Sequence, residues 1–364
     1  MKMTEMNKGN KKRIASILTT AMLAAMLAGC GGGQTEAPSE TPAQSGSEAA
    51  EPQVSTGEVY EIAFSSHNAT GTISNLAVEY FADLVKEKSE GRIQVSFYQD
   101  GTLANELEAM QMVKTGEIQM CLLLDNFSTQ LCDGYDPCII PFVFNSSDDA
   151  AAVYDEANLG DVISQVCKDN GNVYLMGVQK RTPRLLTAKS AIETPDQLAG
   201  INIRVPQIDY WCDVWNGLGA VSTVVDWNET YQALQTGVVD CQENPIDNIY
   251  ANKIYEVNSY VMMTEHQYGV NHWVANVDFV DGMDEDMRAV LQECIDEACA
   301  YGDELLEEKS QEYFDELESA GSITVVETDK EAWRDRASDT IDKILNDSFA
   351  PAVQEYVKNY MNGN

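Results

Sequence analysis

The run Ile118-Gln119-Met120-Cys121-Leu122-Leu123-Leu124 is almost continuously apolar. A strand of this kind is typical of a sheet that is covered on both faces, because both sets of alternating side chains must then be buried. Two strand-like runs precede it, at Val59–Phe64 and Arg92–Tyr98, and helical patterns at 71–88 and 104–115 separate the three. The order βαβαβ predicts a parallel sheet with helices on both sides, and therefore an α/β fold.

Strand and helix patterns continue to alternate along the rest of the chain. The expected elements are, in order, a helix at 148–170, a strand at 173–178, a helix start at Thr194-Pro195, a strand at 201–205, helices at 211–217 and 228–236, a strand at 238–241, a long helix at 284–320, a strand at 323–326 and helices through Met361. At about 100–200 residues per domain, the length allows two folded parts. We expect two lobes with chain crossovers between them.

The charge balance argues against one class of partner. The 364 residues include 23 Lys and Arg against 59 Asp and Glu, a formal net charge of −36. The first 29 residues hold five basic side chains and one acidic side chain, so the remainder carries −40. A surface this negative repels phosphate backbones, and we expect no nucleic-acid partner. The hydrophobic fraction of 44% is ordinary for a globular protein.

The N-terminus has the pattern of an export signal. A basic segment ends at Arg13, and an apolar stretch follows it to Ala28, so residues 1–29 are predicted to be a signal peptide. The sequence Leu27-Ala28-Gly29-Cys30 resembles the bacterial lipobox, in which the thiol of the cysteine is lipidated. The alternative is an ordinary signal peptide with a chance cysteine. Residues 30–57 are rich in Gly, Pro, Ser, Thr and Glu and predict a flexible linker. We expect an exported protein, lipid-anchored through Cys30 on the outer face of the cytoplasmic membrane.

Motifs for phosphate loops, dinucleotide binding, zinc proteases and serine hydrolases do not occur in the sequence. Pairs of carboxylates arise by chance in so acidic a chain, so they give a glycosidase no specific support. Eight cysteines follow Cys30, and an even count in an exported chain invites disulfides. We doubt such pairing, since Cys121, Cys167 and Cys294 sit among apolar neighbours where a thiol packs as a small hydrophobe. We expect no enzyme activity, no cofactor and no metal.

The basic residues are distributed unevenly. No Asp or Glu lies between Asn170 and Ile192, where four cations occur: Lys180, Arg181, Arg184 and Lys189. Surface ion pairs are the ordinary explanation for arginines in an acidic chain. Arg204 differs, because it ends the predicted strand at 201–205, and ligands of open α/β sheets bind at that edge. Its planar guanidinium matches a carboxylate in a two-pronged way. We therefore expect a cleft of locally positive charge.

Residues 184–273 resemble the solute-binding proteins of TRAP (tripartite ATP-independent periplasmic) transporters, the DctP-type family. The matching stretches are R-L-L-T at 184–187, T-P-D-Q-L-A-G-I-N-I-R-V-P at 194–206, L-G-A at 218–220, W-N-E-T-Y-Q-A-L-Q-T-G-V-V-D-C-Q-E-N-P at 227–245, Y-E-V at 255–257 and T-E-H at 264–266. The run at 227–245 is specific to that family. Weaker matches at 81–93, 101–103 and 140–144 extend the resemblance over most of 58–350.

The resemblance implies a set of binding residues. It assigns Arg204 to a two-pronged salt bridge with the substrate carboxylate. Arg184, with Arg181 as the alternative, would assist it. The other candidates are Asn244 as a donor to the same carboxylate, Trp227 as an aromatic cleft residue, His266 near the cleft, His67 and Asn68 in the first loop, Asp125 and Asn126 beside Leu124, and Gln207. A loop, hinge or capping role is the alternative for His67, Asn68 and His266.

The sequence also departs from the family pattern. Cys241 stands where a glycine is usual, and 222–225 replaces a Pro-Thr-Pro-Met run. In the sialic-acid-binding branch a glutamate occupies the position of Leu124, which puts a sialic-acid substrate in doubt.

The resemblance implies a two-lobed fold similar to periplasmic binding proteins, with mixed sheets, a cleft between the lobes and a long C-terminal helix that spans both. Lobe I is expected at 58–180 plus 268–303, and lobe II at 181–267 plus 304–360. The implied function is capture of a small organic acid, keto acid or sugar acid and its delivery to TRAP membrane permease subunits driven by an ion gradient. The alternatives are a binding protein of the same fold that serves a sensor kinase or an ABC importer, and a secreted lipid-anchored hydrolase.

Overall fold

The structure is a computed structural model that describes residues 57–155 and 157–363. The chain divides into two units, 1–53 and 54–364, and the described residues belong to the second. The predicted signal peptide and Cys30 lie outside the described residues. No helix among the described residues combines the length and the hydropathy that a membrane span requires.

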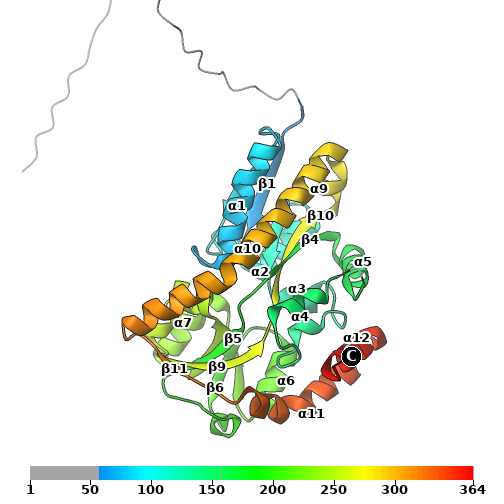
Figure 1. Ribbon diagram of the computed structural model, residues 1–364. Helices are drawn as coiled ribbons and strands as arrows, with labels where there is room; N and C mark the ends of the chain where they lie inside the picture. The colour runs from blue at the N-terminus through cyan, green and yellow to red at the C-terminus, as the bar shows by residue number, and fades with distance from the viewer. Residues whose placement is uncertain (1–56, 156, 364) are drawn as a thin grey trace, which may run out of the picture. The chain divides into compact units, whose positions relative to one another are not determined.

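The first sheet has five strands (Figure 1). In spatial order they are β2 (Ile93–Tyr98), β1 (Tyr60–Ser65), β3 (Met120–Leu123), β10 (Val270–Asn276) and β4 (Val173–Lys180). The three N-terminal strands run parallel, and β10 runs antiparallel to both of its neighbours. The predicted βαβαβ unit is therefore confirmed, and lobe I is built on this sheet.

The second sheet has six strands and forms the framework of lobe II. In spatial order they are β11 (Thr324–Val326), β9 (Tyr260–Gln267), β5 (Arg184–Ala188), β8 (Cys241–Pro245), β6 (Asn202–Val205) and β7 (Val221–Val224). Strands β6, β7 and β8 run parallel to one another, whereas β5 is antiparallel to β8 and β9. We propose that the lobe boundaries lie where the chain leaves one sheet for the other, near 181–183, near 268–269 and within the longest helix.

Helices cover the sheets and connect their strands. The α-helices among the described residues are α1 (Ile73–Lys88), α2 (Glu106–Thr115), α3 (Asn126–Gln130), α4 (Ser147–Ala152), α5 (Gly160–Gly171), α6 (Asp209–Gly217), α7 (Trp227–Thr236), α8 (Ile246–Ala251), α9 (Val277–Gly282), α10 (Glu285–Ser319), α11 (Lys330–Ser348) and α12 (Pro351–Met361). Short 3₁₀ turns occur at Pro137–Ile139, Pro195–Leu198 and Ile254–Glu256.

The position of β3 between two layers of helices explains why its sequence is continuously apolar. Met120 and Leu122 pack in the core beneath α1 and α10, whereas Cys121 and Leu123 pack in the core beneath α2 and α5. All four side chains are buried. Burial on both faces removes the polar alternation that a half-exposed strand would show.

Aromatic rings fill the centre of lobe I. The ring of Trp273 on β10 meets Phe64 edge to face at 5.3 Å between centroids, and Phe81 of α1 at 5.5 Å. All three side chains are fully buried. Edge-to-face pairs of this kind add about 0.5–1.5 kcal/mol each beyond the burial of their apolar area.

Helix α10 is the 35-residue helix that the pattern at 284–320 predicted. It packs on α1 and β4 in lobe I, and further along on α8 in lobe II, so it spans both lobes (Figure 1). Gly302 lies at its closest approach to lobe I, where an added Cβ would clash with the amide of Gln179 and lie 3.1 Å from the Cβ of Ala77.

Three sequence-based expectations for local structure are corrected. The helix expected at 148–170 is two helices, α4 and α5, because the backbone of Gly160 passes directly under the carbonyl of Tyr154, where a side chain would not fit. The strand expected at 238–241 is instead β8, which begins at Cys241. The helix expected to start at Thr194 is a four-residue 3₁₀ turn. Strands β5, β7, β9 and β10 were not anticipated from the sequence.

Gly302→Ala tests the close packing of α10. Alanine normally stabilises a helix interior relative to glycine, but here the new methyl group meets the buried Gln179 side chain, so we expect a loss of about 1–3 kcal/mol in the free energy of unfolding. Gly282→Ala in α9 is the control, because nothing lies within 4 Å of its added Cβ, and it should be neutral or stabilising by up to about 1 kcal/mol. Urea unfolding of both variants gives the comparison, and a stabilised Gly302→Ala would contradict this packing.

Candidate functional site

The carboxyl ends of parallel strands from both lobes converge on one cavity. Strands β1 and β3 lead into it from lobe I, and β6, β7 and β8 lead into it from lobe II. Its volume is about 140 Å³. Ligands of open α/β sheets bind at this edge because the strands end there and the connecting loops supply side chains.

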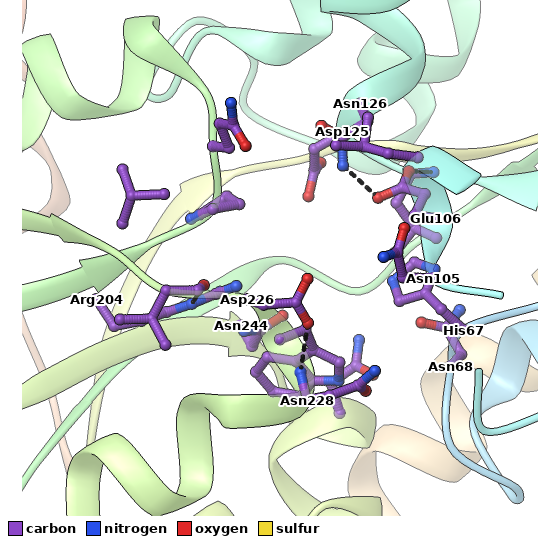
Figure 2. Close-up of a pocket in the computed structure, with 18 of the residues that line it drawn as sticks. His67, Asn68, Asn105, Glu106, Asp125, Asn126, Arg204, Asp226, Asn228 and Asn244 are labelled. Carbon is purple, nitrogen blue, oxygen red and sulfur yellow. Dashed lines mark hydrogen bonds between the residues drawn. The ribbon is translucent and has the colours of Figure 1, made fainter. Parts of the chain in front are cut away.

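The cavity brings together nine of the ten predicted binding residues. They are His67, Asn68, Asp125, Asn126, Arg184, Arg204, Gln207, Trp227 and Asn244. Figure 2 shows Arg204 across the cavity from Asn105, Glu106 and His67. His266 does not line it and lies behind the wall of lobe II. Of the two alternatives for the second arginine, Arg184 lines the cavity, and Arg181 lines a smaller neighbouring one.

Arg204 is a buried cation without a carboxylate partner among the described residues. It is 3% exposed, and its Nε donates to the carbonyl of Val225 at 2.9 Å. Its guanidinium carbon lies 5.4 Å from the ring centroid of Trp227. Neither terminal nitrogen donates to any residue that the structure describes. Burial, together with repulsion from Arg184, lowers the pKa of Arg204 to about 10 although Glu243 opposes this, so the cation is costly where it stands.

Arg184, in contrast, is fully paired. Its Nε and Nη2 donate to the two carboxylate oxygens of Glu243 at 2.5 and 2.9 Å, and Nη1 donates to Asp125 at 3.2 Å. Its guanidinium also lies over the ring of Trp211. A two-pronged pair of this kind fixes the orientation of both groups. Arg184 therefore borders the cavity with most of its donors already used.

Glu243 connects this pair to His266. Burial alone would raise the pKa of Glu243, but Arg184 and His266 outweigh it and lower the pKa to about 2. Burial lowers the pKa of His266, although Glu243 opposes this, and the ring is neutral near pH 7. The neutral ring then donates from Nε2 to Glu243 at 3.0 Å and accepts at Nδ1 from Thr264 at 2.9 Å. His266 holds Glu243, which in turn holds Arg184.

Asp125 connects the lobes. It follows β3 of lobe I, and its two oxygens accept from Arg181 at 3.1 Å and from Arg184 at 3.2 Å. Both arginines lie at the start of lobe II. Burial lowers the pKa of Arg181 although Asp125 opposes this, and burial raises the pKa of Asp247 although Arg181 opposes it. Asp125 thus lines the cavity chiefly as a counterion.

The expectation of a locally positive cleft is wrong. Lys180 pairs with Asp148 and Asp303, Lys189 donates to the carbonyl of Leu234, and both arginines of the acid-free stretch pair with acids. Around the cavity and in the layer behind it, carboxylates outnumber guanidinium groups five to three: Glu106, Asp125, Asp226, Glu243 and Asp247 against Arg181, Arg184 and Arg204. The partners come from other segments, which a count along one stretch does not detect. Of these three arginines, Arg204 is the one without a carboxylate partner among the described residues.

Six polar residues of the site were not anticipated from the sequence. They are the cavity residues Asn105, Glu106, Asp226, Asn228 and Asn248, and the buried Glu243. The sequence held one signal for these residues. Asn105 and Glu108 have the spacing of a capping box, which marks the start of α2 at the cavity. Asp226 likewise caps α7 by accepting from the backbone N–H of Asn228 at 3.0 Å.

His272 lies behind the lobe I wall in a buried polar network. Its ring stacks on Phe127 of α3, the helix that carries Asn126, at 3.7 Å between centroids. Nε2 lies 2.7 Å from the hydroxyl of Tyr154 and 3.9 Å from Asp136. Burial lowers the pKa of His272 to about 4, although Asp136 opposes this.

Comparisons with known proteins agree on one family. A profile of the bacterial extracellular solute-binding proteins, family 7 (DctP), matches residues 64–348. The C4-dicarboxylate-binding protein DctB of Bacillus subtilis is 28% identical over 279 residues, covering 75% of this chain and 79% of that protein. A solute-binding protein of Roseobacter denitrificans, RD1_1052, is 29% identical over 287 residues, covering 77% of this chain and 85% of the relative.

Solved structures share the fold. A TRAP periplasmic solute-binding protein from Roseobacter denitrificans with bound L-galactonate superposes with a TM-score of 0.74 at 25% identity, over 83% of this chain and 98% of that one. Another from Shewanella oneidensis, with bound succinate, gives a TM-score of 0.75 at 23% identity, over 82% and 98%. The two mixed sheets of this chain match the fold of these solute-binding proteins. The chain belongs to family 7 of these proteins, the DctP family.

Glu243→Gln tests the buried ion pair. Glutamine keeps the shape of the side chain but removes the charge that compensates Arg184, and we expect a loss of about 3–5 kcal/mol in the free energy of unfolding at pH 7. Glu293→Gln is the control, since Glu293 pairs with Lys88 but is 61% exposed, and it should cost less than about 1 kcal/mol. Urea unfolding measures both, and equal losses would refute the role of Glu243.

His272→Gln tests the pH dependence of stability. Between its ordinary pKa of 6.5 and about 4, His272 is neutral in the folded protein and protonated in the unfolded chain. The unfolded chain therefore binds more protons, and the free energy of unfolding falls as the pH falls from 6.5 to 4, by roughly 3 kcal/mol at most from this group.

We expect a flatter slope of unfolding free energy against pH in His272→Gln than in the wild type, measured by urea unfolding across that window. Phe81→Leu, a core change elsewhere in lobe I, should lower the whole curve without changing its slope. Parallel curves for the wild type and His272→Gln would exclude this assignment.

Proposed function

We propose that the protein captures a small organic carboxylate on Arg204, between its two lobes, and delivers it to a TRAP-type permease driven by an ion gradient. The observation that carries this proposal is the unpaired, buried guanidinium of Arg204, beside a second arginine that is fully paired. A buried charge persists only where something compensates it, and a ligand carboxylate supplies that compensation.

The geometry of Arg204 suits a two-pronged contact. Because Nε is occupied by the carbonyl of Val225, the two terminal nitrogens remain to meet the two oxygens of a carboxylate. The Asn244 amide uses one of its two N–H donors on Gln242 at 2.8 Å, so the other is available to the ligand. Trp227 closes one side of the guanidinium and limits its contact with water.

Enclosure of the ligand in the cavity strengthens the attraction between its carboxylate and Arg204. Two unit charges 4 Å apart attract by about 1 kcal/mol in water but by about 4 kcal/mol at an effective dielectric constant of 20. Residues of both lobes line the cavity and Arg204 is only 3% exposed, so a ligand that touches both lobes favours their closed arrangement. Affinity and closure are then coupled, which is what a carrier requires.

Membership of the family supports the proposed delivery to a permease. The N-terminal sequence supports the proposed lipid anchor. Relatives of this chain are described as C4-dicarboxylate-binding and 2,3-diketo-L-gulonate-binding proteins, and related structures hold L-galactonate or D-glucuronate. These are all small acids. The lipobox-like Leu27-Ala28-Gly29-Cys30 supports an anchor on the outer face of the membrane, with residues 30–57 as the linker. A permease rather than a sensor kinase is the partner that this family favours.

Substitution of Arg204 tests the proposal. A thermal-shift screen of organic acids, uronates and keto acids first identifies the carboxylate that stabilises the protein most. At about 100 times its dissociation constant, this ligand should stabilise the wild type by about 2.7 kcal/mol. Arg204→Ala should abolish that stabilisation, and Arg204→Lys should lose most of it, because an ammonium group does not reproduce the two-pronged contact.

Arg336→Ala is the matched control for the loss of one positive charge, since Arg336 is exposed and does not line the cavity. It should retain full ligand stabilisation. Unchanged ligand binding in Arg204→Ala would overturn the assignment of Arg204.

A further inference from the structure

The end of the cavity opposite Arg204 has a different chemistry. It is formed by amides, one imidazole and one carboxylate: His67, Asn68, Asn105, Glu106, Asn126 and Asn228. Arg184 and Arg204 are the cations among the described residues that line the cavity, and both belong to lobe II. The opposite end therefore offers no Lys or Arg among these residues to bind a second anionic group. Figure 2 shows this separation between Arg204 and the lobe I residues.

This end of the cavity presents both hydrogen-bond acceptors and amide N–H donors, the latter from Asn105, Asn126 and Asn228. The amide nitrogen of Asn126 donates one of its two N–H groups to Glu106 at 2.6 Å, which leaves the other N–H and the side-chain oxygen to meet a ligand. That oxygen is buried and has no hydrogen-bond partner among the described residues. The same is true of the side-chain oxygen of Asn248, whose residue is 5% exposed. Buried acceptors of this kind require donors, because an unpaired one carries its full desolvation cost.

Glu106 sets the orientation of this wall. Its two oxygens accept from the backbone N–H of Leu124 at 2.6 Å and from the amide of Asn126 at 2.6 Å. Because both oxygens of Glu106 accept, the Asn126 amide turns its nitrogen toward Glu106 and its oxygen away from it. Asp226, at the rim, adds a second negative charge and has one oxygen that no described residue contacts. A carboxylate placed here would meet like charges and acceptors.

These contacts identify a chemical class. Hydroxyl groups both donate and accept, so they match a wall of amides and carboxylates, whereas a second carboxylate only accepts. We propose that the ligand is a polyhydroxylated monocarboxylate, an aldonate or uronate, held by its carboxylate on Arg204 and by its hydroxyls on the Glu106–Asn126 wall. Aldarates would place a second carboxylate against that wall and short dicarboxylates offer it at most one or two hydroxyls, so both classes should bind more weakly. This inference rests on the proposed function, since it assumes that Arg204 binds the carboxylate.

The first experiment compares acids that differ only at the far end. Isothermal titration of the purified protein uses a panel of hexonates and hexuronates of varied stereochemistry, the matching aldarates, and succinate and malate. A site built to bind hydroxyls should reject an acid that presents a second carboxylate by roughly 100-fold or more. The best aldonate or uronate should therefore bind at least that much more tightly than its aldarate and than either short dicarboxylate.

The outcomes separate this inference from the proposed function. A succinate, malate or aldarate that binds as tightly as the best sugar acid, and loses binding in Arg204→Ala, overturns the inference and leaves the carboxylate site standing. Tight binding of an amine-bearing zwitterion, with no sugar acid bound, also overturns it. Sugar-acid binding that survives Arg204→Ala refutes both the inference and the site on which it rests.

The second experiment turns the Asn126 amide so that the wall presents a donor where it now presents an acceptor. In Glu106→Gln, the new amide nitrogen donates to the Asn126 oxygen, so the Asn126 amide turns and presents its nitrogen to the cavity. We expect the ratio of dissociation constants between the aldarate and the matching aldonate to fall by about tenfold or more, the value of one hydrogen bond to a charged group. This ratio does not change if the variant is generally destabilised, because both dissociation constants are then affected equally. Glu117→Gln, an exposed position just beyond the end of α2 and outside the cavity, should leave the ratio unchanged, and an unchanged ratio in Glu106→Gln contradicts the role of this wall.

Discussion

The desolvated guanidinium of Arg204 is the constraint around which the cavity is organised. A buried cation must be compensated, and the protein supplies compensation for its neighbours but not for this group. Arg184 receives Glu243 and Asp125, and Arg181 receives Asp125, whereas Arg204 receives a single backbone carbonyl through Nε. The neighbouring pairs matter to Arg204 because they neutralise cations that would otherwise compete with it for the same anion. On the proposed function, this leaves one arginine for a ligand within a strongly acidic protein.

Rigid supports hold this arrangement in place. His266 orients Glu243, and Glu243 orients Arg184 from the neighbouring strand. In lobe I, Glu106 orients Asn126 and caps the end of β3 through Leu124. Each support is a charge-assisted hydrogen bond in a largely buried setting, where such bonds are strong and costly to break. The cavity is therefore preorganised at both ends, which reduces the entropy that a ligand must overcome on binding.

The sequence alone was sufficient for prediction where local chemistry determines the structure. The apolar run at 118–124 predicted a strand buried on both faces, and Arg204 was identified because it ends a strand at the edge where ligands bind. The sequence was insufficient where partners are distant along the chain. The strand expected at 238–241 left out the polar residues Gln242, Glu243 and Asn244, yet they form β8 and are buried against β5 and β6. The positive cleft was inferred from a stretch whose cations are paired by residues from other elements. No count along the chain detects such pairings.

The choice of arginine at position 204 has a consequence for the surroundings in which the protein works. Burial shifts the pKa of Arg204 only to about 10. A lysine in an equally buried position can lose its proton near neutrality, since documented buried lysines titrate at about pH 5–6. The guanidinium remains charged across the whole range of acidity that an exported protein meets. On the proposed function, the pH dependence of capture would then follow the ionisation of the ligand rather than that of its receptor.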